Sequence, residues 1–236
     1  EANELLSRLR KAVVDGLPVA LPMFSSCSPG WIKYMEHYHP EMLDHLSTCK
    51  SPQQMFGALA KTYYARQIRK RAEDVFVVSV MPCTAKKFEA QRPEMRSSGV
   101  RDVDVVLTTR ELARMIDRAG IDFQSLPDEA MDSPLGISTG AADIFANTGG
   151  VMEAALRTAY EAITGRSFPF ENLHVKSLAG LEGIKVAEIL IEEAKPEWSF
   201  LNGVTVRVAV AHTLSNAERV IQRLRSGQEQ FHFIEV

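Results

Sequence analysis

Two cysteines stand where apolar segments of the sequence end, and each has a proline beside it. Cys27 lies two residues before Pro29 in FSSCSPGW, and Cys83 directly follows Pro82 in MPCTAKKFE. Core filling is the commoner role for any single reduced cysteine. A proline and a turn beside each thiol argue against that role here. The placement instead indicates a nucleophilic thiolate or a metal ligand.

Two lysines follow Cys83 where a helix is predicted to start. Lys86 and Lys87 fall in the first turn after the cysteine. A cation and the amide groups of a helix N-terminus can hold a thiolate or another anion there. Solvent-facing lysines are the simpler alternative for one of the two, but they explain less well why Met81 and Pro82 precede the cysteine.

The elements that would position these residues alternate between helices and apolar strands. Runs at 19–26 and 74–82 predict strands that end at the two cysteines, the second of them covered on both faces. In parallel sheets the ligand crevice lies at the carboxyl ends of strands, so both thiols are expected at one edge. Residues 19–120 therefore indicate one parallel α/β lobe, and the second half repeats the class with different connections.

Local signals predict further elements along the chain. Apolar spacing predicts a helix over 2–14, and Thr108 or Thr109 can cap a helix that Gly120 closes. The runs at 204–213 and 230–236 predict two more strands. A Gly-, Ser- and Asp-rich segment at 126–150 carries few periodic apolar residues and is too long for a casual loop. Such a segment usually has a function.

Composition excludes several partner classes. The chain has 236 residues, 45% hydrophobic and 24% charged, with a net charge of -3, which is typical of a globular protein with a large core. No basic face is expected, so nucleic acid is not an expected partner. No membrane span or signal peptide is indicated, which predicts a cytoplasmic location, although the first helix could equally follow a cut inside a longer protein. Three widely spaced cysteines make a disulfide framework a poor interpretation.

Several segments resemble the iron-only (FeFe) hydrogenase family. MPCTAKKFE at 81–89 matches that family's M-P-C-x-x-K-x-x-E signature in full, and PMFSSCSPGW at 22–31 is similar to its T-S-C-C-P-x-W signature. TGAADIFANTGGVMEAALR, LSTCKSPQQMFGALAKTYYA and RDVDVVLTTRELARMI also resemble the family. The similarity therefore covers essentially the whole chain, as the catalytic (H-cluster) domain of the large or alpha subunit.

The resemblance implies a fold, an activity and a cofactor. The fold is α/β, with two lobes of mostly parallel sheet flanked by helices, at about 1–125 and 126–236, and a cluster site in the cleft between them. The cofactor is a cysteine-held 4Fe-4S cubane joined to a two-iron unit that bears CO, cyanide and a bridging amine-dithiolate. The activity is reversible H2 oxidation and proton reduction by an anaerobic oxidoreductase. Its electron partners would be ferredoxin or NAD-linked iron-sulfur and flavin subunits.

Position by position, the resemblance also implies residue roles. Cys83 matches a cubane ligand, Lys86 matches a lysine that binds a cyanide, and Cys27 matches the thiol that passes protons to the bridging amine. The rest of the proton path matches Ser47, Glu4 and Glu1, with Arg8 near its outer end. The residues packed around the two-iron unit match Ser51, Pro52, Gln53, Met81, Pro82 and Phe145. Thiol, hydroxyl and carboxylate groups make chemical sense as a relay, because each can accept and release a proton.

Two departures from the family pattern concern the cluster ligands. The position before the proline, where the family has a second cubane cysteine, is Ser28 here. A hydroxyl is a weak substitute for a thiolate on iron-sulfur, so Cys27 could take over the ligand role or the cubane could be held differently. The third signature, E-x-M-x-C-x-x-G-C, is expected to begin at about Glu235. The last two cubane ligands are therefore expected beyond Val236.

Three functions remain open at this point. The first is the enzyme, as part of a longer subunit. The second is a non-catalytic relative, either an iron-sulfur scaffold or a hydrogen sensor, or a fragment or apo form without the cluster. The third, a plain α/β binding domain, leaves the placement of cysteine and lysine to chance. A complete relay favours the enzyme, because a scaffold has no need of Cys27, Ser47 and Glu4 together.

Overall fold

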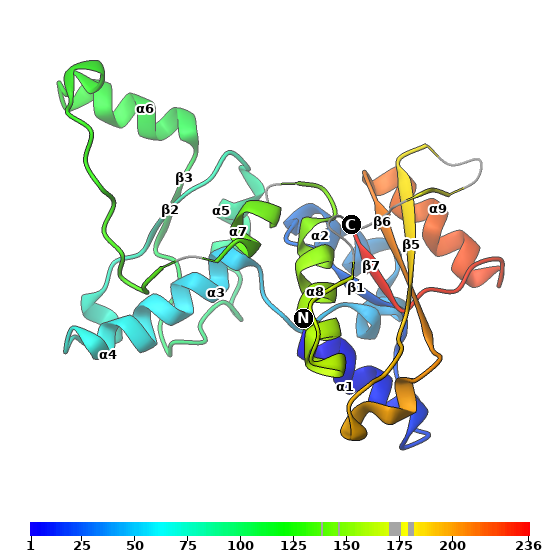
Figure 1. The fold of residues 1–236 in the computed structure, drawn as a ribbon. Coiled ribbons are helices and arrows are strands. Elements are labelled where there is room, and N and C mark those ends of the chain that lie inside the picture. The colour runs from blue at the N-terminus through cyan, green and yellow to red at the C-terminus, as the bar shows by residue number, and fades with distance from the viewer. Residues whose placement is uncertain (138, 146, 170–175, 179–181) are drawn as a thin grey trace. The chain divides into compact units, whose positions relative to one another are not determined.

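A computed structural model gives the fold of the chain (Figure 1). It describes residues 1–137, 139–145, 147–169, 176–178 and 182–236. The chain divides into two compact units. Unit 1 comprises residues 1–26, 31–49 and 139–236, and unit 2 comprises residues 27–30 and 50–138. Unit 1 therefore gathers segments from both ends of the sequence.

Unit 1 is built on a five-stranded sheet of order β1-β7-β6-β5-β4. Its strands are β1 (Met23–Ser25), β4 (Lys176–Ser177), β5 (Ile184–Leu190), β6 (Thr205–Ala211) and β7 (Phe233–Glu235). β7 pairs in parallel with both β1 and β6, whereas β5 is antiparallel to both β6 and β4. The run at 230–236 is thus confirmed as a strand.

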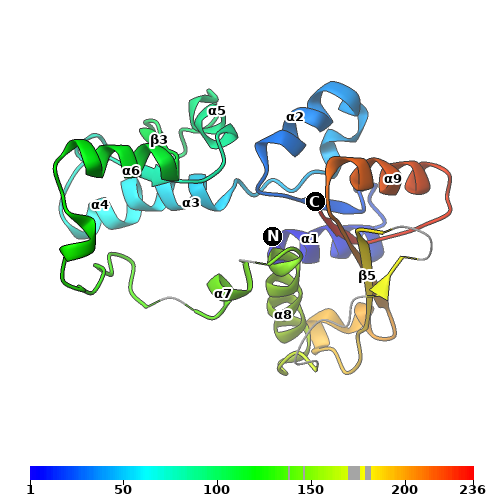
Figure 2. The ribbon, with the colours of Figure 1, turned by 90° about the horizontal axis from the view of Figure 1, so that it is seen from above.

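Helices cover both faces of this sheet. Successive residues of its strands point to opposite faces, and each face contributes to its own apolar core. On one face, α1 (Ala2–Val13) and α8 (Gly150–Thr164) pack on strand residues such as Val208 and Phe233. On the other, α2 (Pro29–Tyr38) and α9 (Leu214–Arg225) pack on residues such as Phe24 and Ile234. Figure 2 shows α8 and α9 on opposite sides of β5. The short helices α7 (Ala141–Phe145), Pro40–His45 and Pro196–Leu201 complete the unit.

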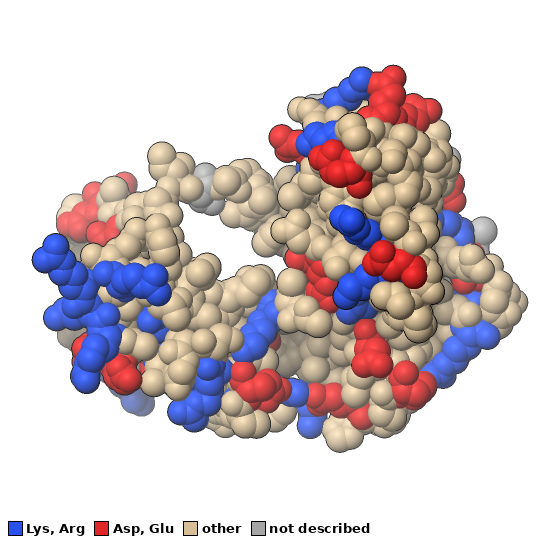
Figure 3. Space-filling view, turned by 90° about the horizontal axis from the view of Figure 1, so that it is seen from below, with Lys and Arg blue, Asp and Glu red and all other residues tan. Residues whose placement is uncertain are grey.

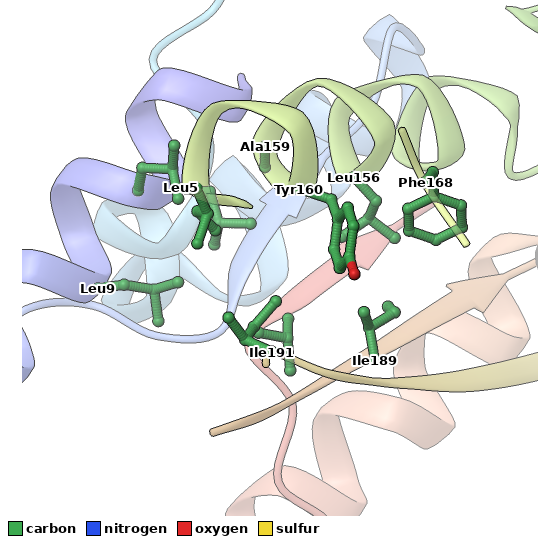
Figure 4. Close-up of a pocket in the computed structure, with 11 residues that line it drawn as sticks. Leu5, Leu9, Leu156, Ala159, Tyr160, Phe168, Ile189 and Ile191 are labelled. Carbon is green, nitrogen blue, oxygen red and sulfur yellow. The ribbon is translucent and has the colours of Figure 1, made fainter. Parts of the chain in front are cut away.

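A small apolar pocket of about 20 Å³ lies in the first of these cores (Figure 4). Leucines of α1 and α8 face Ile189 of β5 and Ile191 just after it, and Tyr160 and Phe168 also line the pocket. Such a space offers a water molecule almost no polar partner, so it belongs to the apolar core. None of the residues predicted for the site lines it.

Unit 2 is built around a short parallel pair of strands, β2 (Val78–Val80) and β3 (Val105–Leu107). Its helices are α3 (Pro52–Leu59), α4 (Ala65–Gln67), α5 (Ala85–Gln91) and α6 (Thr109–Arg118), with a π-helical turn at Ala60–Tyr64 and 3-10 turns at Ala72–Asp74 and Phe123–Ser125. Its core is small and centres on Val77, Val103 and Val106. An ion pair between the buried Lys61 and the partly exposed Asp104, at 2.8 Å, links the π-helical turn to the segment before β3.

The α/β class is confirmed, but three details differ from the sequence analysis. The first lobe does not run over 1–125: β1 pairs with β7 and α1 packs on α8, so residues 1–26 and 31–49 join the C-terminal half. β2 is not covered on both faces, since Val78 and Val80 are each 46% exposed. Cys27 and Cys83 follow strands of different sheets, β1 of the five-stranded sheet and β2 of the two-stranded pair, rather than two strands of one sheet.

The start of α6 is capped as expected. Thr108 accepts a hydrogen bond from the Glu111 amide at 3.1 Å.

Contrary to expectation, basic side chains do gather on the surface. The exposed run at 66–71 is rich in Arg and Lys, and Figure 3 shows it over the α4 end of unit 2. Among the described helices, none combines the length and apolar character needed to cross a bilayer.

Candidate functional site

The turn from β2 into α5 exposes Cys83 and buries Lys86. The amide of Met81 still follows the strand ladder, donating to the Leu107 carbonyl at 2.8 Å. Pro82 and Cys83 then turn away with exposed side chains. The Cys83 carbonyl accepts from the amide of Lys86 at 3.2 Å, which begins the helix. Lys86 therefore falls in the first turn of α5, as predicted, but it is only 5% exposed.

The Lys86 ammonium is held by two acceptors. It lies 3.2 Å from Oε1 and 3.3 Å from Oε2 of Glu89, one helical turn further along α5. It also donates to the backbone carbonyl of Cys27. Charged groups taken out of water are stable only when they are paired, and this pair is almost completely buried.

The start of α3 joins the same carboxylate. Ser51 accepts from the Gln54 amide as the helix N-cap, and its hydroxyl donates to Glu89 Oε2 at 2.8 Å. The Gln53 amide donates to the same oxygen at 3.2 Å and accepts from the Ser79 hydroxyl of β2 at 2.7 Å. Unit 2 therefore brings Ser51, Gln53 and Lys86 together, although they come from separate stretches of sequence.

The remaining predicted residues of unit 2 lie at the surface or its edge. The side chains of Cys27, Ser28 and Pro52 are exposed. Met81 is half-buried and packs against the small core of the unit. Exposed thiols on Cys27 and Cys83 agree with a role at a site better than with core filling.

In unit 1, Glu4 of α1 is the centre of a second polar cluster. Its carboxylate accepts from the Ser47 hydroxyl at 2.7 Å, from Arg8 at 2.8 Å and from the backbone amide of Thr48 at 3.0 Å. Burial acts to raise the pKa of Glu4, but the hydrogen bonds from Ser47, Thr48 and Arg8 outweigh it and hold the pKa below its usual value. Ser47 and Arg8 are thus both in direct contact with Glu4.

Glu1 forms a hydrogen bond with a residue outside the Glu4 cluster. Its Oε1 accepts from the buried hydroxyl of Ser25 in β1 at 2.6 Å, and Ser25 is the cross-strand partner of Glu235 in β7. Burial raises the pKa of Glu235, and the nearby charge of Glu1 raises it further. The hydrogen bonds from the amides of Met152 and Gly149 lower this pKa but do not outweigh burial.

Glu235 also fixes the segment that carries Phe145. Its two carboxylate oxygens accept from the amides of Gly149 and Met152 at 2.9 and 2.7 Å, which caps the N-terminus of α8. A Cβ at Gly150 would lie 1.8 Å from the carbonyl oxygen of Ile144, so only glycine lets α7 pack this closely on α8. Phe145, the last residue of α7, is 43% exposed.

Three participants were missed by the sequence analysis. Glu89 had a signal: it is the last letter of M-P-C-x-x-K-x-x-E and lies three residues after Lys86 on a helix, where the two side chains face each other. Ser25 and Glu235 had none, because only the pairing of β1 with β7 brings them to Glu1 and α8.

Comparison with known proteins shows the family and the fold of the chain. The family model described as "Iron only hydrogenase large subunit, C-terminal domain" matches residues 1–236. The periplasmic Fe hydrogenase large subunit of Nitratidesulfovibrio vulgaris is 50% identical over 235 residues, which cover 100% of this chain and 52% of that protein. Apo FeFe-hydrogenase HydA1 from Chlamydomonas reinhardtii, in a variant form, superimposes with a TM-score of 0.82 at 37% identity and covers 99% of this chain and 62% of that one.

A relative with a different name matches at lower identity. The cytosolic iron-sulfur assembly component 3 of Pongo abelii is 32% identical over 225 residues, which cover 92% of this chain and 44% of that protein. The chain thus spans about half the length of these curated relatives. Since the family model covers every residue, the chain belongs to the family of iron-only hydrogenase large subunits and corresponds to their C-terminal domain.

Proposed function

We propose that the chain is part of an enzyme that interconverts H2 with protons and electrons. The observation that carries the proposal is the M-P-C-x-x-K-x-x-E segment, where an exposed thiol precedes a buried lysine that is paired with Glu89. A binding domain has no reason to bury Lys86 one turn after Cys83, since burying charge costs free energy that a surface lysine avoids. The match to hydrogenases over the whole chain supports the same function.

The residues of unit 2 fit part of an iron-sulfur cluster site. The thiol of Cys83 is the soft donor that iron-sulfur clusters take, and it is open to solvent. In the part of the chain that the structure describes, no three His, Cys, Asp or Glu side chains gather closely enough to hold a metal ion. Cys83 would therefore be one ligand of a 4Fe-4S cubane, and Cys27, with Ser28 beside it, is the next candidate.

The two-iron unit would contact other residues of the same network. When bound, it would supply the metal chemistry that splits or forms H2. Lys86 would bind one of its cyanides with an ammonium proton. Ser51, Gln53, Met81, Pro52 and Pro82 would shape its surroundings, and the resemblance adds Phe145 to this set. A buried ammonium is a strong partner for an anion, because the low dielectric strengthens the attraction.

Proton movement would use Cys27, Ser47, Glu4 and Glu1. The support is the contact between the Ser47 hydroxyl and Glu4 at 2.7 Å, which lets a proton pass between them without rearrangement. The pKa of Glu4 lies below its usual value, so the carboxylate stays ionised and accepts the hydrogen bond from Ser47. Arg8 donates to the carboxylate at 2.8 Å, and the resemblance implies a place for it near the outer end of the path.

Electrons would pass to ferredoxin or to NAD-linked iron-sulfur and flavin subunits. A cytoplasmic location stays a prediction, and one of the relatives above is named periplasmic.

One observation favours a second candidate, an iron-sulfur scaffold or hydrogen sensor. Ser28 stands where a ligand sulfur is expected, and a weaker cubane site suits a protein that does not turn over. A relative named for iron-sulfur assembly is consistent with this alternative.

Anaerobic expression of the full-length protein with hydrogenase maturation enzymes separates the two. The enzyme predicts infrared bands of CO and cyanide together with H2 turnover. Bands without turnover would refute the enzyme and favour the sensor.

Replacing Cys27 by alanine distinguishes its two possible roles, with Cys49→Ala as the matched control. Loss of turnover with an intact cubane signal indicates a relay, whereas loss of the cubane in electron paramagnetic resonance indicates a ligand. Equal turnover in both variants would remove Cys27 from the mechanism.

A further inference from the structure

Glu89 is a buried carboxylate that the proposed mechanism does not use. It is 6% exposed and receives hydrogen bonds from Ser51 and Gln53 in addition to the Lys86 ammonium. Burying a carboxylate is costly, and a helix surface would place it in water at no such cost. A fully satisfied position of this kind is well suited to fixing the geometry of its partners.

The contacts of Lys86 determine where its ammonium points. The group carries three N–H donors: one reaches the Cys27 carbonyl, and the two Glu89 oxygens, at 3.2 and 3.3 Å, can share a second. The third donor is then left for an anionic ligand. Because the lysine side chain is long and flexible, this direction depends on the carboxylate.

The same carboxylate connects three segments of unit 2. Through Ser51 and Gln53 it holds the first turn of α3, and through Lys86 it holds the backbone at Cys27. The Gln53 amide also donates to the Lys86 carbonyl at 3.3 Å, which adds a direct link between α3 and α5. A change at Glu89 therefore reaches the lysine, the cysteine and the helix start together.

We propose that Glu89 is the positioning residue for Lys86, aiming its ammonium at the cyanide-bearing two-iron unit while fixing the backbone of Cys27. This inference rests on the proposed function for the identity of the ligand. The ion pair between Lys86 and Glu89 does not depend on the proposed function, because it is present in the chain without any cluster. Glu89 touches no reacting atom and acts only through Lys86 and Cys27.

The test compares Glu89→Gln, which keeps the shape and removes the charge, with Glu94→Gln, an exposed carboxylate of the same unit, as control. Both full-length proteins are loaded with the two-iron unit and freed of excess cofactor. Glu89→Gln is expected to retain about 10-fold less of the unit, with the cubane signal intact. The cyanide bands of the retained fraction are expected to shift, and Glu89→Asp is expected to recover part of the retention. Unchanged retention and unchanged bands in Glu89→Gln would overturn the proposal.

A second measurement uses the cluster-free chain. Thermal unfolding of Glu89→Gln, Lys86→Met and the double variant forms a cycle, in which the double variant is expected to be more stable than Glu89→Gln alone. If Glu89→Gln does not fold, the double variant is expected to restore folding, because the unpaired buried charge has been removed. Strict additivity, or a double variant that stays unfolded, would overturn the proposal. Coupling in this cycle without two-iron binding by the parent protein would instead refute the proposed function.

Discussion

Gly57 of α3 provides a direct test of how the polar network in unit 2 is held in place. A Cβ added there would lie 2.5 Å from the carbonyl oxygen of Asp102 and 2.8 Å from a methyl of Val103, where ordinary contact needs at least 3.4 Å. The obstacle is fixed backbone, because the buried Asp102 carboxylate accepts two amides, from Ser97 and Ser98, at 2.8 Å each. Gly57→Ala therefore has to move α3 by about 1 Å, which is roughly the difference between the 2.5 Å approach and the 3.4 Å of ordinary contact in a close-packed interior.

The cost follows from two opposing effects. Because the obstacle is backbone, the overpacking cost is expected at the upper end of its usual range, about 2–3 kcal/mol; alanine regains about 1 kcal/mol over glycine in a helix, so the expected net loss is about 1–2 kcal/mol. For a chain of this size that lowers the melting temperature by roughly 2–8 °C. Because α3 carries Ser51 and Gln53, the same variant is expected to retain less of the two-iron unit.

Circular dichroism on the cluster-free chain measures the loss of stability, with Gly140→Ala as control because a methyl there meets nothing within 4 Å. A Gly57→Ala protein as stable as its parent would refute the argument from close approach.

Three further outcomes are expected. The pKa of Glu4 is held below 4.5, so its carboxylate adds stability that is present above that pH and lost as the pH falls through the lowered pKa. Glu4→Gln is therefore expected to flatten the curve of stability against pH in acid. An unchanged curve would contradict this. Asp104→Asn removes the carboxylate partner of the buried Lys61, which keeps the Arg101 carbonyl as an acceptor, and is expected to cost about 1–3 kcal/mol in urea unfolding; an unchanged stability would show that water replaces the carboxylate. Glu235→Ala leaves the amides at the start of α8 without acceptors, so hydrogen exchange at Gly149 is expected to accelerate with a loss of about 1–3 kcal/mol; unchanged protection would argue against the cap.

Features set by neighbouring residues could be predicted from the sequence. The helix at 2–14 forms as α1, and Thr108 caps α6 with Glu111 in the reciprocal position. Both depend on apolar spacing and capping within a few residues. The motif around Cys83 likewise predicted a thiol that does not fill the core and a helix start, because a turn and a helix N-terminus are local features.

Features that depend on distant pairing could not be predicted. Nothing near Ser25 or Glu235 indicates that the two are partners, and this pairing moves the first part of the chain into unit 1. The exposed face of β2 was missed because a β-branched run is compatible with one buried face as well as with two. Only the elements that pack on each face of the sheet determine which of the two occurs. The burial of Lys86 also escaped prediction, since it depends on Glu89, Ser51 and the Cys27 carbonyl meeting at one point.

The pairing of β1 with β7 has a consequence for how the chain acquires its structure during synthesis. Met23 finds its partner only at Phe233, near the other end of the sequence, whereas β2 and β3 of unit 2 are much closer together along the chain. Closing so long a loop is entropically costly and slow, and it cannot begin before the partner strand has left the ribosome. Unit 2 can therefore form first, while β1 has no strand to pair with and α1 has no sheet to pack on. A chaperone that shields the first apolar segment during this interval would raise the yield of folded protein.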